Sequence, residues 1–96
     1  MRLEFSPCVE GDLDAIAGYI VLDSPRHATA FLQEIRAELR IVARNPLLYR
    51  LRLEIGKDAR VAVVGRYVIL FRVMEKMVRV ERIVYGGRDL PELLKE

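Results

Sequence analysis

The chain has 96 residues, of which 52% are hydrophobic and 31% are charged, a balance typical of a folded globular protein and unlike that of a disordered one. This length suits one domain with one main core, so we expect a single domain over residues 1–96. The formal net charge of +2 argues against a dedicated duplex-DNA binder, and no apolar run approaches the roughly 20 residues that span a membrane.

A short alternating strand over residues 3–5 precedes a first predicted helix over residues 7–22. Ser6-Pro7 favours a helix start, because serine can accept a bond from a free backbone N–H and proline suits the first helical position. The early acids of this helix are expected to complement the positive end of its dipole: Glu10, Asp12 and Asp14. An apolar stripe follows at helical spacing: Leu13, Ile16, Ala17 and Ile20.

A second helix is predicted directly after the first, with Asp23 marking the break and Ser24-Pro25 repeating the start signal. It ends at Asn45-Pro46, because proline does not continue a helix. Its apolar residues share one face: Ala28, Phe31, Leu32, Ile35, Leu39 and Val42. The short break between the two helices favours an antiparallel helical hairpin.

The last third of the chain is rich in strand patterns. Residues 46–58 are irregular, although the alternation over residues 50–55 would allow a short strand. Three strands joined by tight turns are predicted: 59–64, 67–73 and 77–85. The alternation slips at residues 82–84, which indicates either a bulge or a strand covered on both faces. Gly86-Gly87 ends the last strand, and Asp89 is placed to cap a short final helix.

The predicted element order is β-α-α-β-β-β with a short C-terminal helix. Three consecutive strands joined by hairpins give an antiparallel meander. The two helices need a large apolar surface for their stripes, and a sheet face is the one that this chain offers. We therefore expect an α+β fold in which a helical hairpin packs on one face of a largely antiparallel sheet.

Few residues suggest metal or nucleophilic chemistry. His27 is the only histidine, and it lies in the first turn of the second predicted helix, where we interpret it as a surface residue. Cys8 is the only cysteine. One histidine and one cysteine are too few for the three or four ligands that zinc usually takes. We expect no metal, no cofactor and no internal disulfide. A lone thiol, without a secretory pattern near residue 1, fits a cytoplasmic protein.

Basic residues concentrate in the second half of the chain. Residues 1–49 hold five basic and seven acidic residues, whereas residues 50–96 hold eleven and seven, so an anionic partner is expected at the second half. Guanidinium groups on strands can hold RNA phosphates. Three tyrosines could stack on bases: Tyr49, Tyr67 and Tyr85. A plainer interpretation is that four charged residues pair across the solvent face of a sheet: Glu75, Arg79, Glu81 and Arg82. Arg60 and Arg88 flank strand ends and are less easily explained in that way.

Several short segments follow one another along nearly the whole chain in a characteristic order: Phe5-Ser6-Pro7, Asp12-Leu13, Ile16 to Ile20, Asp23 to Ala28, Phe31, Ile35, Asn45-Pro46, Arg60, Gly65 to Val73 and Val80 to Asp89. Each segment alone is weakly specific. Together, in order and spacing, they resemble the ParE/RelE toxin superfamily, also called plasmid stabilisation proteins. The resemblance implies the fold expected above. It also implies a cognate antitoxin, a small protein that wraps around the toxin and forms a hetero-oligomer with it.

The resemblance implies one of two activities. RelE-like members are ribosome-dependent mRNA endoribonucleases, with basic side chains on the central strands and a tyrosine or histidine near the C-terminus. The corresponding set in this chain is Arg60, Arg82, Tyr85 and Arg88. ParE-like members inhibit DNA gyrase. A third alternative is a decayed toxin that survives only as a binding partner of its antitoxin.

The sequence departs from the nuclease pattern at two places. Residues 68–70 are Val-Ile-Leu, where RelE-like enzymes tend to place an arginine, and the tail after Asp89 holds no tyrosine or histidine. RNA cleavage needs one group to take a proton and another to give one. Tyr85 with its neighbouring arginines makes a thin set, so we favour the ParE-like branch, a toxin that binds gyrase and is not itself an enzyme.

The antitoxin is expected at the irregular segment and at the sheet edge. The segment is rich in apolar residues: Leu47, Leu48, Leu51, Leu53 and Ile55. An exposed apolar patch often marks a partner site, and an open strand edge is a template for pairing. We predict that the antitoxin covers part of residues 47–60 or the sheet edge, through five residues: Leu48, Tyr49, Leu51, Leu53 and Arg60. The alternative is that the leucines close the core beneath the sheet.

Overall fold

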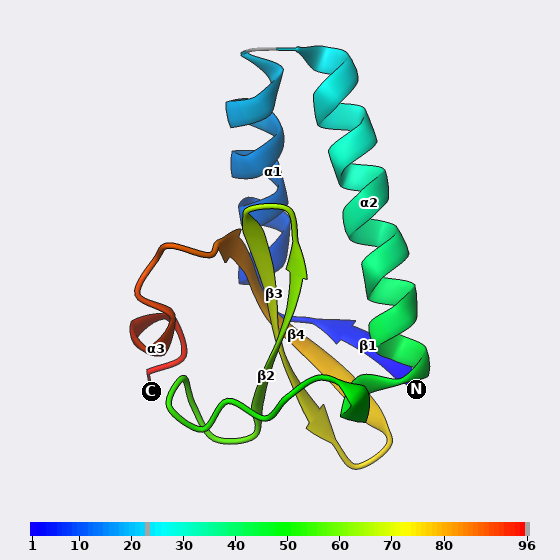
Figure 1. Cartoon of the computed structure of the whole chain (residues 1–96), viewed down its shortest axis with the longest axis vertical. Coiled ribbons are helices and arrows are strands. Elements are labelled where there is room, and N and C mark those ends of the chain that lie inside the picture. The colour runs from blue at the N-terminus through cyan, green and yellow to red at the C-terminus, as the bar shows by residue number, and fades with distance from the viewer. Residues whose placement is uncertain (23, 96) are drawn as a thin grey trace.

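The elements follow one another in the predicted order, in a computed structural model that describes residues 1–22 and 24–95 (Figure 1). They are β1 (Arg2–Phe5), α1 (Cys8–Val21), α2 (Pro25–Arg44), the 3-10 helix η1 (Pro46–Leu48), β2 (Ala59–Val64), β3 (Tyr67–Met74), β4 (Met77–Tyr85) and α3 (Leu90–Leu93). The predicted α+β order and the short last helix are confirmed. Asp23, which was expected to mark the break between the helices, lies outside the described residues.

The four strands form one sheet in the order β1-β4-β3-β2. The pairs β2–β3 and β3–β4 are antiparallel, as predicted for a meander. Strand β1 lies parallel to β4, with Arg2 opposite Met77 and Phe5 opposite Val80. The first and last strands of the sequence are therefore neighbours, and β1 and β2 form the two edges of the sheet.

Helices α1 and α2 form a hairpin that packs on one face of this sheet, and its tip extends past the sheet (Figure 1). The apolar stripes meet the strands in one core, whose fully buried members include Ile35 and Val42 of α2 and Phe71, Val78 and Val80 of the sheet. Burial of these stripes is the main stabilising contribution to the fold, because apolar area removed from water contributes about 25 cal/mol per Å².

At the start of each helix the serine hydroxyl accepts a backbone N–H as predicted, although α1 begins at Cys8, after Pro7. The Ser24 hydroxyl accepts the His27 N–H at 3.4 Å, with Pro25 at the first helical position. At α1, the Ser6 hydroxyl accepts the Cys8 N–H at 3.3 Å but donates to the Glu81 carbonyl at 2.5 Å. Ser6 therefore ties the beginning of α1 to the sheet.

Both alternatives raised for the last strand occur. Leu70 pairs with Arg82 while Phe71 pairs with Val80, so Glu81 is the extra residue of a bulge in β4. This bulge lies directly before the segment where the alternation slips. Ile83 and Val84 are both buried, so β4 is covered on both faces after the bulge.

The strand that residues 50–55 would allow does not form. Leu51 makes a single bridge to Arg60, and the chain then turns, with the Ile55 N–H donating to the Arg52 carbonyl at 3.0 Å. The turn points Ile55 into a second, smaller core on the other face of the sheet, with Ala59 and Leu70. Residues of the C-terminal segment cover this cluster: Leu90, Leu93 and Leu94. Asp89 precedes α3, but its side chain makes no capping bond.

Candidate functional site

The leucines of the irregular segment face solvent and do not close a core. Four of them form what we call the leucine surface: Leu47, Leu48, Leu51 and Leu53, with 65%, 81%, 40% and 66% of their area exposed. Ile55, at 4%, is the one apolar residue of the group that is buried. Several exposed apolar side chains on one short segment are typical of a protein interface.

Contacts of Tyr49 and Arg60 anchor the chain segment that carries the leucine surface. The Tyr49 ring packs edge-on against Phe71 at 5.5 Å between centroids, and its hydroxyl donates to Glu38 Oε1 at 2.6 Å. Arg60 Nη1 donates to the Tyr49 carbonyl at 2.5 Å, and the backbone of Arg60 forms a β-bridge with Leu51. Both residues thus fix the backbone that presents the leucines.

The pKa of Tyr49 predicts a pH dependence of stability. Burial and the Glu38 carboxylate disfavour the phenolate and raise the pKa of Tyr49 from 10.0 to about 12. The folded state therefore holds this proton more tightly, so its contribution is complete below pH 10 and is lost between pH 10 and about 12. Urea unfolding at a series of pH values should show the wild type losing stability relative to Tyr49→Phe over this interval. Parallel curves for the two proteins would contradict the coupling.

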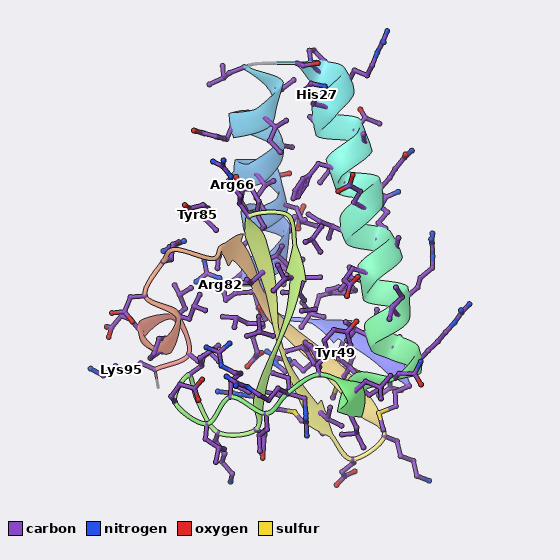
Figure 2. All side chains as sticks on the ribbon, viewed as in Figure 1. His27, Tyr49, Arg66, Arg82, Tyr85 and Lys95 are labelled. Carbon is purple, nitrogen blue, oxygen red and sulfur yellow. The ribbon has the colours of Figure 1, made fainter. Side chains whose placement is uncertain are left out.

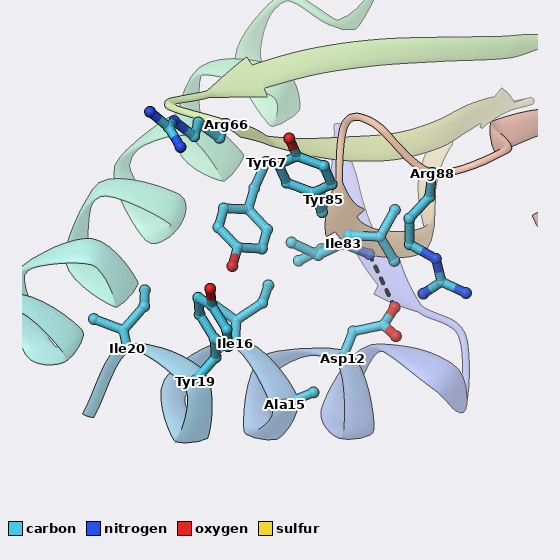
Figure 3. Close-up of a pocket in the computed structure, with 11 residues that line it drawn as sticks. Asp12, Ala15, Ile16, Tyr19, Ile20, Arg66, Tyr67, Ile83, Tyr85 and Arg88 are labelled. Atoms are coloured by element: carbon cyan, nitrogen blue, oxygen red, sulfur yellow. Dashed lines mark hydrogen bonds between the residues drawn. The ribbon is translucent and has the colours of Figure 1, made fainter. Parts of the chain in front are cut away.

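Asp12 and Arg82 form a partly buried ion pair between α1 and β4. Arg82 donates two bonds to the carboxylate, from Nε to Oδ2 at 2.8 Å and from Nη2 to Oδ1 at 2.7 Å. The Ile83 N–H donates to Oδ2 at 3.0 Å (Figure 3). The bonds to Asp12 raise the pKa of Arg82 above its usual value. Asp12 therefore lies in the buried stripe of α1, where its carboxylate holds the Nε–Nη2 edge of Arg82.

The expected pairing across the solvent face is correct for one pair and wrong for Arg82. Glu81 accepts bonds from Arg79 Nε at 2.6 Å and from Arg72 Nη1 at 3.0 Å. Arg82 instead turns to α1, because the bulge at Glu81 changes which side of β4 the next residues face. Glu75 lies in the turn after β3, with a φ of 48°.

A pocket of about 580 Å³ lies between α1 and the ends of β3 and β4, and we call it the α1–β4 pocket (Figure 3). Arg66 and Arg88 stand at its opposite ends in this view. Its wall includes three tyrosines and three isoleucines: Tyr19, Tyr67, Tyr85, Ile16, Ile20 and Ile83. The rings of Tyr67 and Tyr85 meet edge to face, with centroids 6.1 Å apart.

Gly87 sets the position of the Tyr85 ring in this pocket. A Cβ at Gly87 would collide with the ring, so no larger residue fits without moving Tyr85. The glycine pair that the sequence marks as a strand end thus also provides space for a pocket residue.

The four residues predicted for a nuclease are not brought together. Arg60 pairs with Phe71 of β3, whereas Tyr85 pairs with Tyr67, which is four positions away and thus about 13 Å along that strand. Arg60 and Tyr85 also lie on opposite sides of β3, on β2 and β4. Arg82 is held by Asp12, which leaves Tyr85 and Arg88 in the pocket.

The sequence prediction did not select three residues at this site: Asp12, Tyr19 and Arg66. Asp12 carried a usable signal, because it lies three positions after Val9 and four before Ile16, inside the buried stripe of α1. The exposure of Tyr19 and Arg66 around one pocket depends on how α1 meets the sheet, which no local pattern shows.

Other candidates lie elsewhere. His27 is exposed in the first turn of α2, at the tip of the hairpin and away from Tyr85 and Arg66 (Figure 2). Over residues 1–22 and 24–95, no three His, Cys, Asp or Glu side chains are grouped so that they could hold a metal ion. In the same residues, none of the helices has the length and apolar character to cross a membrane.

Comparison with known proteins shows what this fold and sequence resemble. The family model of the ParE toxin of the type II toxin–antitoxin system parDE matches residues 3–90. Among solved structures, a chain of the chromosomal ParDE TA system from P. aeruginosa superposes with a TM-score of 0.76 at 25% sequence identity. The match covers 88% of this chain and 95% of that chain. A search of curated protein sequences gave no match.

Proposed function

This chain belongs to the ParE toxin family of type II toxin–antitoxin systems, and we propose that it is a cytoplasmic toxin that inhibits DNA gyrase. As a member of such a system it has a cognate antitoxin as its partner. We further propose that the antitoxin neutralises the toxin by binding it.

The observation that most supports action by binding is the state of Arg82. Its Nε and Nη2 groups both donate to the two oxygens of Asp12, so this edge of the guanidinium is not available to a phosphate. Tyr85 and Arg88 remain, with Arg60 bound to a backbone carbonyl at a distant part of the sheet. Cleavage of RNA needs a proton acceptor and a proton donor placed together, and this pair does not supply both. The endoribonuclease alternative is therefore the weaker of the two.

The leucine surface supports the placement of the antitoxin. Leu51 makes a backbone bridge to Arg60 of β2, which is an edge strand of the sheet, and the other three exposed leucines lie on the same chain segment as Leu51. A partner that adds to the edge and covers the leucines would remove both apolar area and unpaired backbone groups from water.

Two assays on the purified chain test the proposed activity. Supercoiling of relaxed plasmid by DNA gyrase should be inhibited by the toxin and restored when the cognate antitoxin is added. Messenger RNA on programmed ribosomes should remain intact at the same toxin concentration, because the acid–base pair is incomplete.

Heat-denatured toxin serves as the control for both assays. Cleaved RNA with normal supercoiling would contradict the proposal and make Tyr85 and Arg88 the first residues to replace. Activity in neither assay would favour a chain that only binds its antitoxin.

A further inference from the structure

We propose that the α1–β4 pocket is the surface that engages the target, and that it takes an acidic segment of gyrase. This inference rests on the proposed function, since it assigns a place to the contact that the inhibition requires. The pocket belongs to neither the leucine surface nor the sheet edge at β2, so the two partners would use separate parts of the toxin.

Charge is the first argument. Arg66 and Arg88 line the pocket and are exposed, and neither forms an ion pair with another described residue. The one acid in the wall, Asp12, is offset by Arg82 and by the Ile83 N–H. Two arginines without an ion-pair partner among the described residues therefore border the pocket. Each can donate two hydrogen bonds to one carboxylate, which makes an acidic peptide the complementary ligand.

The wall between the two arginines is apolar and aromatic. Tyr19 is 70% exposed and Tyr85 is 50% exposed, while Ile83 is buried behind them. Tyrosine and arginine are over-represented among the residues that dominate binding energy at protein interfaces, because they combine large contact area with polar groups. A segment with an apolar side chain between two acids would fill the space and meet both ends.

The edge of β4 supplies a third feature. Strand β4 continues to Tyr85, whereas its pairing with β1 ends at Val80. The Gly86 N–H donates to the Arg66 carbonyl at 2.9 Å. Since only alternate residues of an antiparallel strand bond to a given neighbour, the backbone groups of Ile83 and Tyr85 point away from β3. Asp12 already takes the Ile83 N–H from this side. Beyond it along the edge is the Tyr85 N–H, on a residue that is 50% exposed, to which an extended segment can bond.

The chemistry of the two surfaces favours the target at the pocket and the antitoxin at the leucines. Permanent protein interfaces are more hydrophobic than transient ones, and the leucine surface is strongly apolar. A surface that must stay exposed in the free toxin until it meets its target is better made of tyrosine and arginine, which remain well hydrated. Opposite charges would also speed that encounter.

Charge reversal in the pocket tests the proposal. The double variant Arg66→Glu/Arg88→Glu should need at least about tenfold more toxin for half-inhibition of gyrase supercoiling, because it replaces attraction by repulsion. Its matched control is Arg36→Glu/Arg40→Glu on the exposed face of α2, which makes the same change in net charge. This control should inhibit within about twofold of the wild type if the effect is local rather than one of overall charge.

The outcomes separate the pocket from the proposed function. Equal inhibition by the wild type and the pocket variant overturns the proposal for the pocket and leaves the gyrase proposal standing. A wild-type chain that does not inhibit supercoiling contradicts the proposed function, and the proposal for the pocket falls with it. Binding of a single-stranded RNA oligonucleotide that is lost in the pocket variant would also overturn the proposal, in favour of a nucleic-acid ligand.

Hydrogen exchange gives a second readout that does not depend on the variants folding. Addition of purified gyrase to the wild-type toxin should slow amide exchange at residues 83–88, because their backbone groups become bonded or covered. Exchange that is unchanged there, in a mixture where supercoiling is inhibited, places the contact elsewhere and overturns the proposal.

Discussion

Replacing Asp12 by alanine is expected to lower the free energy of unfolding by about 3 kcal/mol, since removing one partner of a buried ion pair leaves the other charge uncompensated. The side chains of Asp12 and Arg82 are only 8% and 20% exposed, so water can solvate little of the Arg82 charge once the carboxylate is removed. The Ile83 N–H would lose its acceptor as well. Thermal unfolding should shift downward by more than about 10 °C for a domain of this size.

Two controls isolate the ion pair from a general effect on α1. Asp14→Ala changes the same residue type on the exposed side of the same helix and should alter stability by less than about 0.5 kcal/mol. The double variant Asp12→Leu/Arg82→Met should recover part of the loss, because no unpaired charge remains. An Asp12→Ala protein as stable as the wild type would show that the pair makes no net contribution.

The second large effect is expected at the leucine surface. The double variant Leu48→Asp/Leu53→Asp should bind the cognate antitoxin at least about 100-fold more weakly, because an apolar interface would have to bury two unpaired carboxylates. Its own stability should change little, since both leucines are largely exposed in the free chain. Isothermal titration with the antitoxin measures the affinity, and in cells the variant toxin should escape neutralisation.

Leu22→Asp is the matched control for this variant. Leu22 is 83% exposed but follows α1 at the tip of the hairpin, outside the leucine surface. Its antitoxin affinity should equal that of the wild type. Hydrogen exchange provides an independent check: if the antitoxin leaves exchange over residues 47–60 unchanged, it binds at a different place.

The parts of the fold that the sequence predicts are those set by local chemistry. The start of α2 follows from Ser24 and Pro25, whose effects act within one helical turn. Gly65 predicts a turn, and in the structure its φ of 59° is a backbone conformation that glycine adopts without strain. The segment 50–55 shows the limit of such patterns, because its alternation is that of a strand while only Leu51 finds a partner.

The candidate sites depend on contacts between distant residues, and this is where prediction from sequence is incomplete. Asp12 and Arg82 are 70 positions apart, so neither residue reveals the other. The outward direction of Leu48 was one of two open alternatives, decided by the turn that sends Ile55 alone into a core. The α1–β4 pocket exists only because α1 lies beside the end of β4.

The parallel pairing of β1 with β4 bears on when a newly made chain becomes a toxin. Strand β1 cannot pair in the sheet until Met77 to Val80 have been synthesised. Asp12 likewise cannot form its ion pair until Arg82 has been synthesised. Pairings this far apart along a chain form slowly compared with the helical hairpin, which needs only local contacts. Before β4 has been made, the first half can form helices but has no finished sheet. A cell that makes this protein therefore has an interval, set by the synthesis and folding of the last strands, before a finished toxin is present.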